Sequence, residues 1–191
     1  MKAAVAYAPG EIKVEEVDTP VPSPGEVLVE VKAAGICGSD LHYHRSNASR
    51  NDSGRIMSGH ELSGRIAAVG EGVKTRKVGE RIVVEPLLGC STCRYCAVGK
   101  YHICKDLQFP GGGFREYTTI REEKAFPIPD HVSYDAASTL DCYAVGAHAV
   151  HRANLSVTDT VAVIGDAAIG LTALEVAKVA GAKKTALIGH H

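Results

Sequence analysis

The stretch Gly89-Cys-Ser-Thr-Cys-Arg-Tyr-Cys-Ala-Val-Gly-Lys-Tyr-His-Ile-Cys104 contains four of the six cysteines of this 191-residue chain. Their spacing is C-x2-C-x2-C-x7-C, and they are Cys90, Cys93, Cys96 and Cys104. Four thiolates on one short loop can converge on a single Zn²⁺ ion and complete its tetrahedral coordination. A metal enclosed in this way holds the fold together and takes no part in a reaction. The stretch therefore predicts a structural zinc site, and we expect the reactive residues elsewhere.

Two other interpretations of the four cysteines stay open. Disulfide bonds suit exported proteins, but two-residue gaps favour a metal, and the apolar run within residues 1–10 is too short for a signal peptide. An iron–sulfur cluster is also held by thiolates. No stretch of about 18 apolar residues is present, so the sequence predicts no membrane span. Reduced, metal-binding cysteines make the cytoplasm the expected location.

The composition is that of an ordinary globular protein. The formal net charge is −1, the hydrophobic fraction is 45% and the charged fraction is 23%. A nearly neutral chain has no basic surface for nucleic acid or for an anionic membrane, so we expect neither partner.

The first part of the chain alternates apolar and polar residues with a period of two, which is typical of half-buried strands. Glycine and proline separate the alternating segments, and many short strands of this kind predict a sandwich or barrel. The polar segment Ser46–Ser58 has no periodicity and predicts an exposed loop. The expected strands are Lys2–Tyr7, Ile12–Val17, Glu26–Ala33, Gly64–Val69, Arg81–Glu85, Tyr117–Ile120 and Lys124–Ile128.

The pattern changes near Ser133. Small residues over Ala136–Ala153 predict a helix that packs closely. The apolar run Asp159–Gly165 predicts a strand buried on both faces. Helical spacing over Ile169–Ala180 and a second apolar run, Lys184–Ile188, complete one βαβ unit.

Three short segments carry residues that bind metals or move protons, although each has an ordinary structural explanation when taken alone. Cys37 stands in Gly35-Ile-Cys-Gly-Ser-Asp-Leu-His42, on an expected loop, and is as easily a buried structural cysteine. His60 and Glu61, in Gly59-His-Glu61, are as easily an exposed or a packed pair without a metal. The acid in Leu140-Asp-Cys142 is as easily a first-turn charge near a helix dipole.

Taken together, these segments resemble the zinc-dependent medium-chain alcohol and polyol dehydrogenases, and the sorbitol dehydrogenase-like branch is the most similar. Val78–Pro86, the four-cysteine loop, Gly113–Tyr117 and Ile128–Ser133 follow in the family's order. The resemblance implies a mainly β GroES-like catalytic domain over residues 1–132. A linking helix over 133–157 and a truncated dinucleotide-binding (Rossmann) domain over 158–191 are expected to follow.

The resemblance also implies two zinc ions and a set of reacting residues. Cys37, His60 and Asp141 correspond to the ligands of a catalytic zinc, with one position open to an alcohol oxygen. Ser39 and His42 correspond to a proton relay, and Glu61 to a glutamate beside the metal. Cys90, Cys93, Cys96 and Cys104 correspond to the structural zinc site. The implied reaction moves a hydride between an alcohol, polyol or carbonyl compound and NAD(P). Members of this family are typically homo-oligomers, which the resemblance implies here too.

The turn Gly165-Asp-Ala-Ala-Ile-Gly170 lies between an expected strand and helix, where a dinucleotide fingerprint stands. Ala167 replaces the middle glycine of G-x-G-x-x-G, and Asp166 adds a negative charge beside the phosphates. Gly189 occupies the position where the family usually has an acid for the ribose hydroxyls, so both NAD and NADP stay open. An ordinary strand-to-helix turn is the alternative. The pair His190-His191 is either native or part of an expression tag.

One βαβ unit is less than a complete nucleotide domain, which needs two βαβαβ halves. We therefore expect the chain to be the first part of a longer product, or to pair with something that covers its apolar strands, and its own activity to be impaired. A non-catalytic zinc-binding or assembly module is the alternative function, and an interaction module would not need Cys37, His60 and Asp141.

Overall fold

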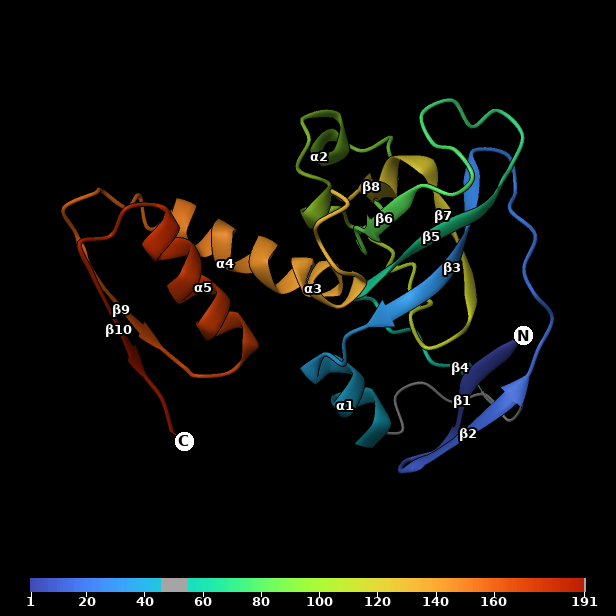
Figure 1. Ribbon diagram of the computed structural model, residues 1–191, viewed down its shortest axis with the longest axis horizontal. Helices are drawn as coiled ribbons and strands as arrows, with labels where there is room; N and C mark the ends of the chain where they lie inside the picture. The colour runs from blue at the N-terminus through green and yellow to red at the C-terminus, as the bar shows by residue number, and fades with distance from the viewer. Residues whose placement is uncertain (46–54, 191) are drawn as a thin grey trace. The chain divides into compact units, whose positions relative to one another are not determined.

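The computed structural model describes residues 1–45 and 55–190 (Figure 1). The chain divides into two compact units, Met1–Ser138 and Thr139–His191. The division falls inside the segment 133–157 that the sequence assigns to a linking helix. Residues 46–54, which belong to the expected exposed loop, lie outside the described residues.

A five-stranded antiparallel sheet forms the centre of the first unit, in the strand order β7-β3-β5-β6-β8. Its apolar side chains are buried together because alternate residues of a strand point to the same face. The sheet confirms the predicted β fold. The strands are β3 (Glu26–Ala34), β5 (Leu62–Val69), β6 (Arg81–Val84), β7 (Tyr117–Arg121) and β8 (Ala125–Pro127). The core residues are Val27, Val29, Leu62, Ile66, Ile82, Val84, Ile120 and Ala125.

A second, three-stranded sheet has the order β2-β1-β4, with β1 (Lys2–Ala8), β2 (Glu11–Glu16) and β4 (Arg55–Ile56). The prediction of an exposed loop over Ser46–Ser58 is wrong at its end, because Arg55 and Ile56 pair with β1. A strand of two residues has no detectable periodicity, so backbone pairing with a distant segment decides its structure.

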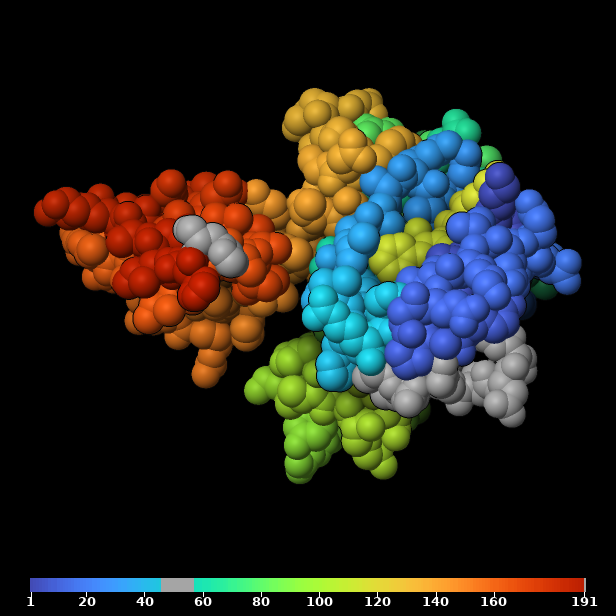
Figure 2. Space-filling view, turned by 90° about the horizontal axis from the view of Figure 1, so that it is seen from below, coloured from blue at the N-terminus to red at the C-terminus, as the bar shows by residue number. Residues whose placement is uncertain are grey.

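Helix α1 (Gly38–Arg45) follows β3, where the sequence predicts a loop. Its side chains are mostly polar and give no amphipathic pattern. Two contacts hold it: the backbone N–H of Cys37 donates to Oδ2 of Asp40 over 2.8 Å, and the N–H of Gly10 donates to the carbonyl of His44 over 3.0 Å. The second contact ties α1 to the β1–β2 hairpin, and Figure 2 shows these cyan and blue segments side by side.

The predicted helix over Ala136–Ala153 is two consecutive helices, α3 (Tyr134–Ser138) and α4 (Leu140–Arg152). Thr139 separates them, with φ −84° and ψ 0°. In the second unit, α4 packs against α5 (Ala168–Val179) through small residues. A Cβ on Gly146 would lie 2.8 Å from the backbone nitrogen of Ala173, so this close packing needs glycine.

The strands β9 (Thr160–Ile164) and β10 (Lys184–Ile188) are parallel and in register, and with α5 they form the predicted βαβ unit. The prediction that β9 is buried on both faces is wrong, because its residues alternate between exposed and half-buried. Among the described residues, only one face of this two-stranded sheet is covered. Ile164 and Ile188, which pair with each other, are 84% and 54% exposed.

None of the helices in the described ranges, 1–45 and 55–190, is long and apolar enough to cross a membrane.

Candidate functional site

The four cysteines of the loop after β6 converge in the structure. Their sulfur atoms all lie within 4.8 Å of one another, and separations of 3.6 Å, 3.8 Å and 4.0 Å join Cys93 to Cys96, Cys93 to Cys104 and Cys90 to Cys96. Four sulfur atoms held at about 2.3 Å from one Zn²⁺ ion lie about 3.8 Å apart, so the cluster has the size of a tetrahedral zinc site. All six cysteines of the chain are free thiols, and none forms a disulfide.

Local backbone geometry brings these sulfur atoms together. The short helix α2 (Arg94–Ala97) and the 3-10 helix η1 (Tyr101–Ile103) turn the loop back on itself. Backbone N–H groups donate to the sulfur atoms: Cys93 to Cys90 over 3.3 Å, and Asp106 to Cys104 over 3.4 Å. Hydrogen bonding from Thr92 lowers the pKa of the Cys90 thiol to about 6, which favours the thiolate that a metal requires.

A pair of charges, buried Lys124 and half-buried Glu85, attaches this loop to the sheet. Nζ of Lys124, which lies between β7 and β8, is 2.9 Å from Oε2 of Glu85, which follows β6. Glu85 also accepts a hydrogen bond from the Tyr101 hydroxyl, and this bond raises the pKa of Tyr101 to about 12. Lys124 lies 4.0 Å from the centre of the Tyr101 ring. No sequence motif predicts this contact, because it joins three segments that are ordinary when taken separately.

A second group of ligand atoms lies near the end of β3. Cys37, His60 and Glu61 each offer an atom within 4.8 Å of the others; Cys37 and His60 are half-buried, and Glu61 is buried. The N–H of Gly35 donates to the carbonyl of Glu61 over 2.7 Å, which joins the two segments. A Cβ on Gly35 would lie 2.2 Å from Oε2 of Glu61, so glycine makes room for that carboxylate.

The other residues proposed for the reaction lie in two places. Ser39 is half-buried and His42 is exposed, and both are on α1 directly after Cys37. Asp40, on the same helix, is 6% exposed and fixes the backbone of Cys37 through the bond described above. Asp141 is half-buried in the first turn of α4, in the second unit. Its role as a metal ligand stays a prediction.

The fingerprint turn, Gly165–Gly170, connects β9 to α5, and two of its positions need glycine. Gly165 has φ +117°, which favours glycine, and a Cβ on Gly170 would lie 1.8 Å from the carbonyl oxygen of Gly165. Ala167 precedes α5 in extended conformation, with φ −82° and ψ 177°. Gly189 directly follows β10. These positions agree with the expected strand–turn–helix context.

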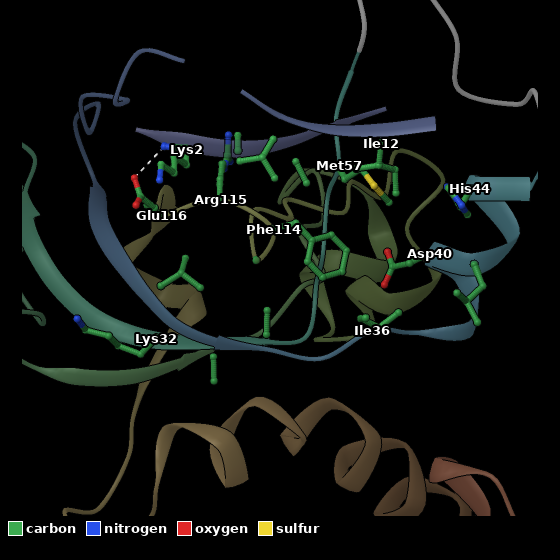
Figure 3. Close-up of a pocket in the computed structure, with 18 residues that line it drawn as sticks. Lys2, Ile12, Lys32, Ile36, Asp40, His44, Met57, Phe114, Arg115 and Glu116 are labelled. Atoms are coloured by element: carbon green, nitrogen blue, oxygen red, sulfur yellow. Dashed lines mark hydrogen bonds between the residues drawn. The ribbon is translucent and has the colours of Figure 1, made fainter. Parts of the chain in front are cut away.

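A cavity of about 660 Å³ opens in the first unit between the β1–β2 hairpin, β3 and α1 (Figure 3). Its wall is mainly apolar, and Asp40 and His44 contribute polar groups from α1. No local sequence pattern predicts this cavity, because its lining residues come from distant segments. The lining residues are Lys2, Ala3, Ala4, Ile12, Val14, Val31, Lys32, Ala33, Ala34, Ile36, Asp40, Leu41, His44, Met57, Gly113, Phe114, Arg115 and Glu116.

Residues 23–130 match the family described as the alcohol dehydrogenase GroES-like domain. The chain belongs to this family. It is 41% identical to sorbitol dehydrogenase of Bacillus subtilis strain 168 in an alignment 189 positions long, which covers 95% of the chain and 54% of that enzyme. The resemblance to zinc-type alcohol and polyol dehydrogenases is therefore confirmed, and the chain spans about half the length of the curated relatives it matches.

Two solved structures have the same fold and contain nicotinamide cofactors. A zinc-binding dehydrogenase of Sinorhizobium meliloti 1021 bound to NADP has a TM-score of 0.89 and 32% identity, covering 97% of this chain and 55% of that one. The alcohol dehydrogenase RspB of E. coli CFT073, in complex with NADH, has a TM-score of 0.81 and 34% identity, covering 98% of this chain and 62% of that one.

Proposed function

We propose that this chain belongs to a zinc-dependent oxidoreductase that transfers a hydride between an alcohol or polyol and NAD(P). The observation that carries the proposal is the presence of two different groups of ligands in one unit. One group consists of four thiolates, which suits a closed structural site. The other combines Cys37, His60 and Glu61, a mixed set typical of metals that act on substrates.

In the proposed site Cys37, His60 and Asp141 hold a zinc ion, and Glu61 lies beside it. When bound, this zinc supplies Lewis acidity to an alcohol or carbonyl oxygen. Asp40 keeps the Cys37 backbone in place through its hydrogen bond to the Cys37 N–H. Ser39 and His42 move the alcohol proton outward; the half-buried hydroxyl and the exposed imidazole suit a path towards solvent.

The dinucleotide is proposed to lie against the turn after β9. Gly165 allows the tight turn, Gly170 lets α5 pack closely, and Ala167 and Gly189 line the approach of the pyrophosphate and the ribose. The NADP and NADH complexes of the two similar structures support a nicotinamide cofactor. Cys90, Cys93, Cys96 and Cys104 hold the second, structural zinc. The proposed partner is a small-molecule alcohol, polyol or carbonyl compound, and the proposed compartment is the cytoplasm. Homo-oligomers are typical of the family, so we expect the whole protein to form one.

A hydride-transfer assay tests this proposal. The zinc-loaded chain is mixed with NAD⁺ or NADP⁺ and a panel of secondary alcohols and polyols that includes sorbitol. We expect slow formation of the reduced nicotinamide that Cys37→Ala abolishes. The matched control is Cys142→Ala, because Cys142 belongs to neither ligand group. No turnover with any substrate, or unchanged turnover in Cys37→Ala, would contradict the proposed function.

A further inference from the structure

The end of β10 lacks the acidic residue that usually hydrogen-bonds to the ribose of the cofactor. In a dinucleotide-binding βαβ unit, an Asp or Glu after the second strand accepts hydrogen bonds from the ribose hydroxyls of NAD. Here Gly189 directly follows Ile188, the last residue of β10. Ile188 pairs with Ile164, and its carbonyl accepts a hydrogen bond from the N–H of Gly165 over 2.8 Å. The end of β10 and the fingerprint turn are therefore in direct contact.

A carboxylate from the fingerprint turn fills the space that a side chain on residue 189 would take. A Cβ built on Gly189 would lie 2.3 Å from Oδ2 of Asp166, 2.6 Å from its Cγ and 2.7 Å from its Cβ. Oδ2 of Asp166 also accepts a hydrogen bond from the backbone N–H of His190 over 3.1 Å. Asp166 therefore lies over the end of β10, although it is 23 positions earlier in the sequence.

The aspartate at position 166 compensates for the missing acid at position 189. Gly189 does not have the positive φ that needs glycine, so space rather than backbone conformation explains the missing side chain. An aspartate at 189 would overlap the Asp166 side chain and place two negative charges together. A carboxylate at one position therefore excludes a carboxylate at the other, and this chain has it at 166.

We propose that Asp166 supplies the carboxylate that recognises the adenosine ribose, and that the chain therefore selects NAD(H) over NADP(H). The inference rests on the proposed function, because it refines the cofactor of that site. A carboxylate accepts several hydrogen bonds at once, so the bond from His190 is compatible with bonds from ribose hydroxyls. The same negative charge repels a 2′-phosphate. Asp166 is thus a specificity-determining residue, placed on the first turn instead of after the second strand.

Binding of cofactor fragments tests this inference without hydride transfer. Isothermal titration calorimetry of the 191-residue chain with ADP-ribose and with 2′-phospho-ADP-ribose measures the preference. We expect ADP-ribose to bind at least about tenfold more tightly, and Asp166→Asn to reduce this ratio about tenfold, as loss of a charged hydrogen-bond acceptor predicts. The swap variant Asp166→Ala/Gly189→Asp returns the carboxylate to the usual position and should restore the preference.

A matched control is Asp159→Asn. Asp159 also accepts a backbone hydrogen bond, from Ser156 over 2.7 Å, but it precedes β9 at the opposite edge of the sheet. This variant should keep the full preference. If Asp166→Asn leaves the ratio of the two fragment affinities unchanged, the inference is overturned and the proposed function stands. A swap variant that shows no preference between the fragments has the same consequence. Failure of ADP-ribose to bind the parent chain also overturns the inference. Intact ADP-ribose preference without hydride transfer contradicts only the proposed function.

Discussion

At the scale of single residues, two glycines of this chain make room for a carboxylate. A Cβ on Gly35 would lie 2.2 Å from Oε2 of Glu61, and a Cβ on Gly189 would lie 2.3 Å from Oδ2 of Asp166. Neither glycine has a positive φ, so the neighbouring acid decides the residue type in both places. Each acid belongs to a proposed site: Glu61 to the mixed ligand group and Asp166 to the nucleotide turn.

We predict that Gly35→Ala weakens the mixed metal site. The new methyl group must displace the Glu61 side chain, and overpacking of this kind typically costs about 1–3 kcal/mol of folding free energy. Zinc titration should show weaker binding of one of two equivalents, and thermal unfolding should give a lower midpoint.

The matched control for this change is Gly38→Ala. Gly38 directly follows Cys37, and Gly35 lies two positions before this cysteine. A Cβ on Gly38 would meet nothing within 4 Å. Its metal affinity and its midpoint should stay close to those of the parent chain. If the two alanine variants behave alike, the close approach of Glu61 to Gly35 does not shape the site.

At the scale of elements, the sequence predicted what periodicity or local spacing determines. The alternating segments became strands, and the four cysteines converged because one short loop holds all of them. Helix α1 was missed because its polar sequence has no helical pattern, and contacts from Asp40 and the Gly10 turn hold it. The proximity of Asp166 to Gly189 was also missed, because it arises only when the βαβ unit folds back.

We predict that Lys124→Met loosens the structural metal loop. Glu85 would keep its bond from Tyr101 and lose its cation, and an uncompensated, mostly buried carboxylate typically costs about 1–3 kcal/mol. Chelator-induced zinc release from the four-cysteine site should become faster, and denaturant unfolding should begin at lower concentration.

The double variant Lys124→Met/Glu85→Gln distinguishes the charge effect from lost packing. Removing both charges leaves no buried charge without a partner, so stability should recover in part. A double variant less stable than Lys124→Met would mean that the pair is not what holds the loop to the sheet.

At the scale of the whole molecule, the two-stranded sheet of the second unit has one covered face and one exposed face. Val163 lies against α5, where a Cβ on Gly170 would be 3.6 Å from its Cγ1. Ile164 and Ile188 lie on the other face and are largely exposed. Apolar strand residues exposed in this way favour association between chains.

We predict that Ile164→Thr/Ile188→Thr reduces concentration-dependent association of the chain. Threonine keeps the preference for strand conformation and removes apolar surface. Light scattering over a range of protein concentrations should show less association, with an unfolding free energy within about 1 kcal/mol of the parent chain. Val163→Thr is the comparison, and it should destabilise the unit without reducing association. Equal association in the parent and the double variant would mean that this face is not involved.

The central claim is that the chain builds two metal sites from separate residues, one structural and one suited to alcohol chemistry. Elemental analysis of the purified, zinc-loaded chain tests it most directly. We predict two zinc ions per chain, one in Cys37→Ser, one in Cys93→Ser, and two in the control Cys142→Ser. A single zinc ion per chain that Cys37→Ser leaves in place would contradict the account.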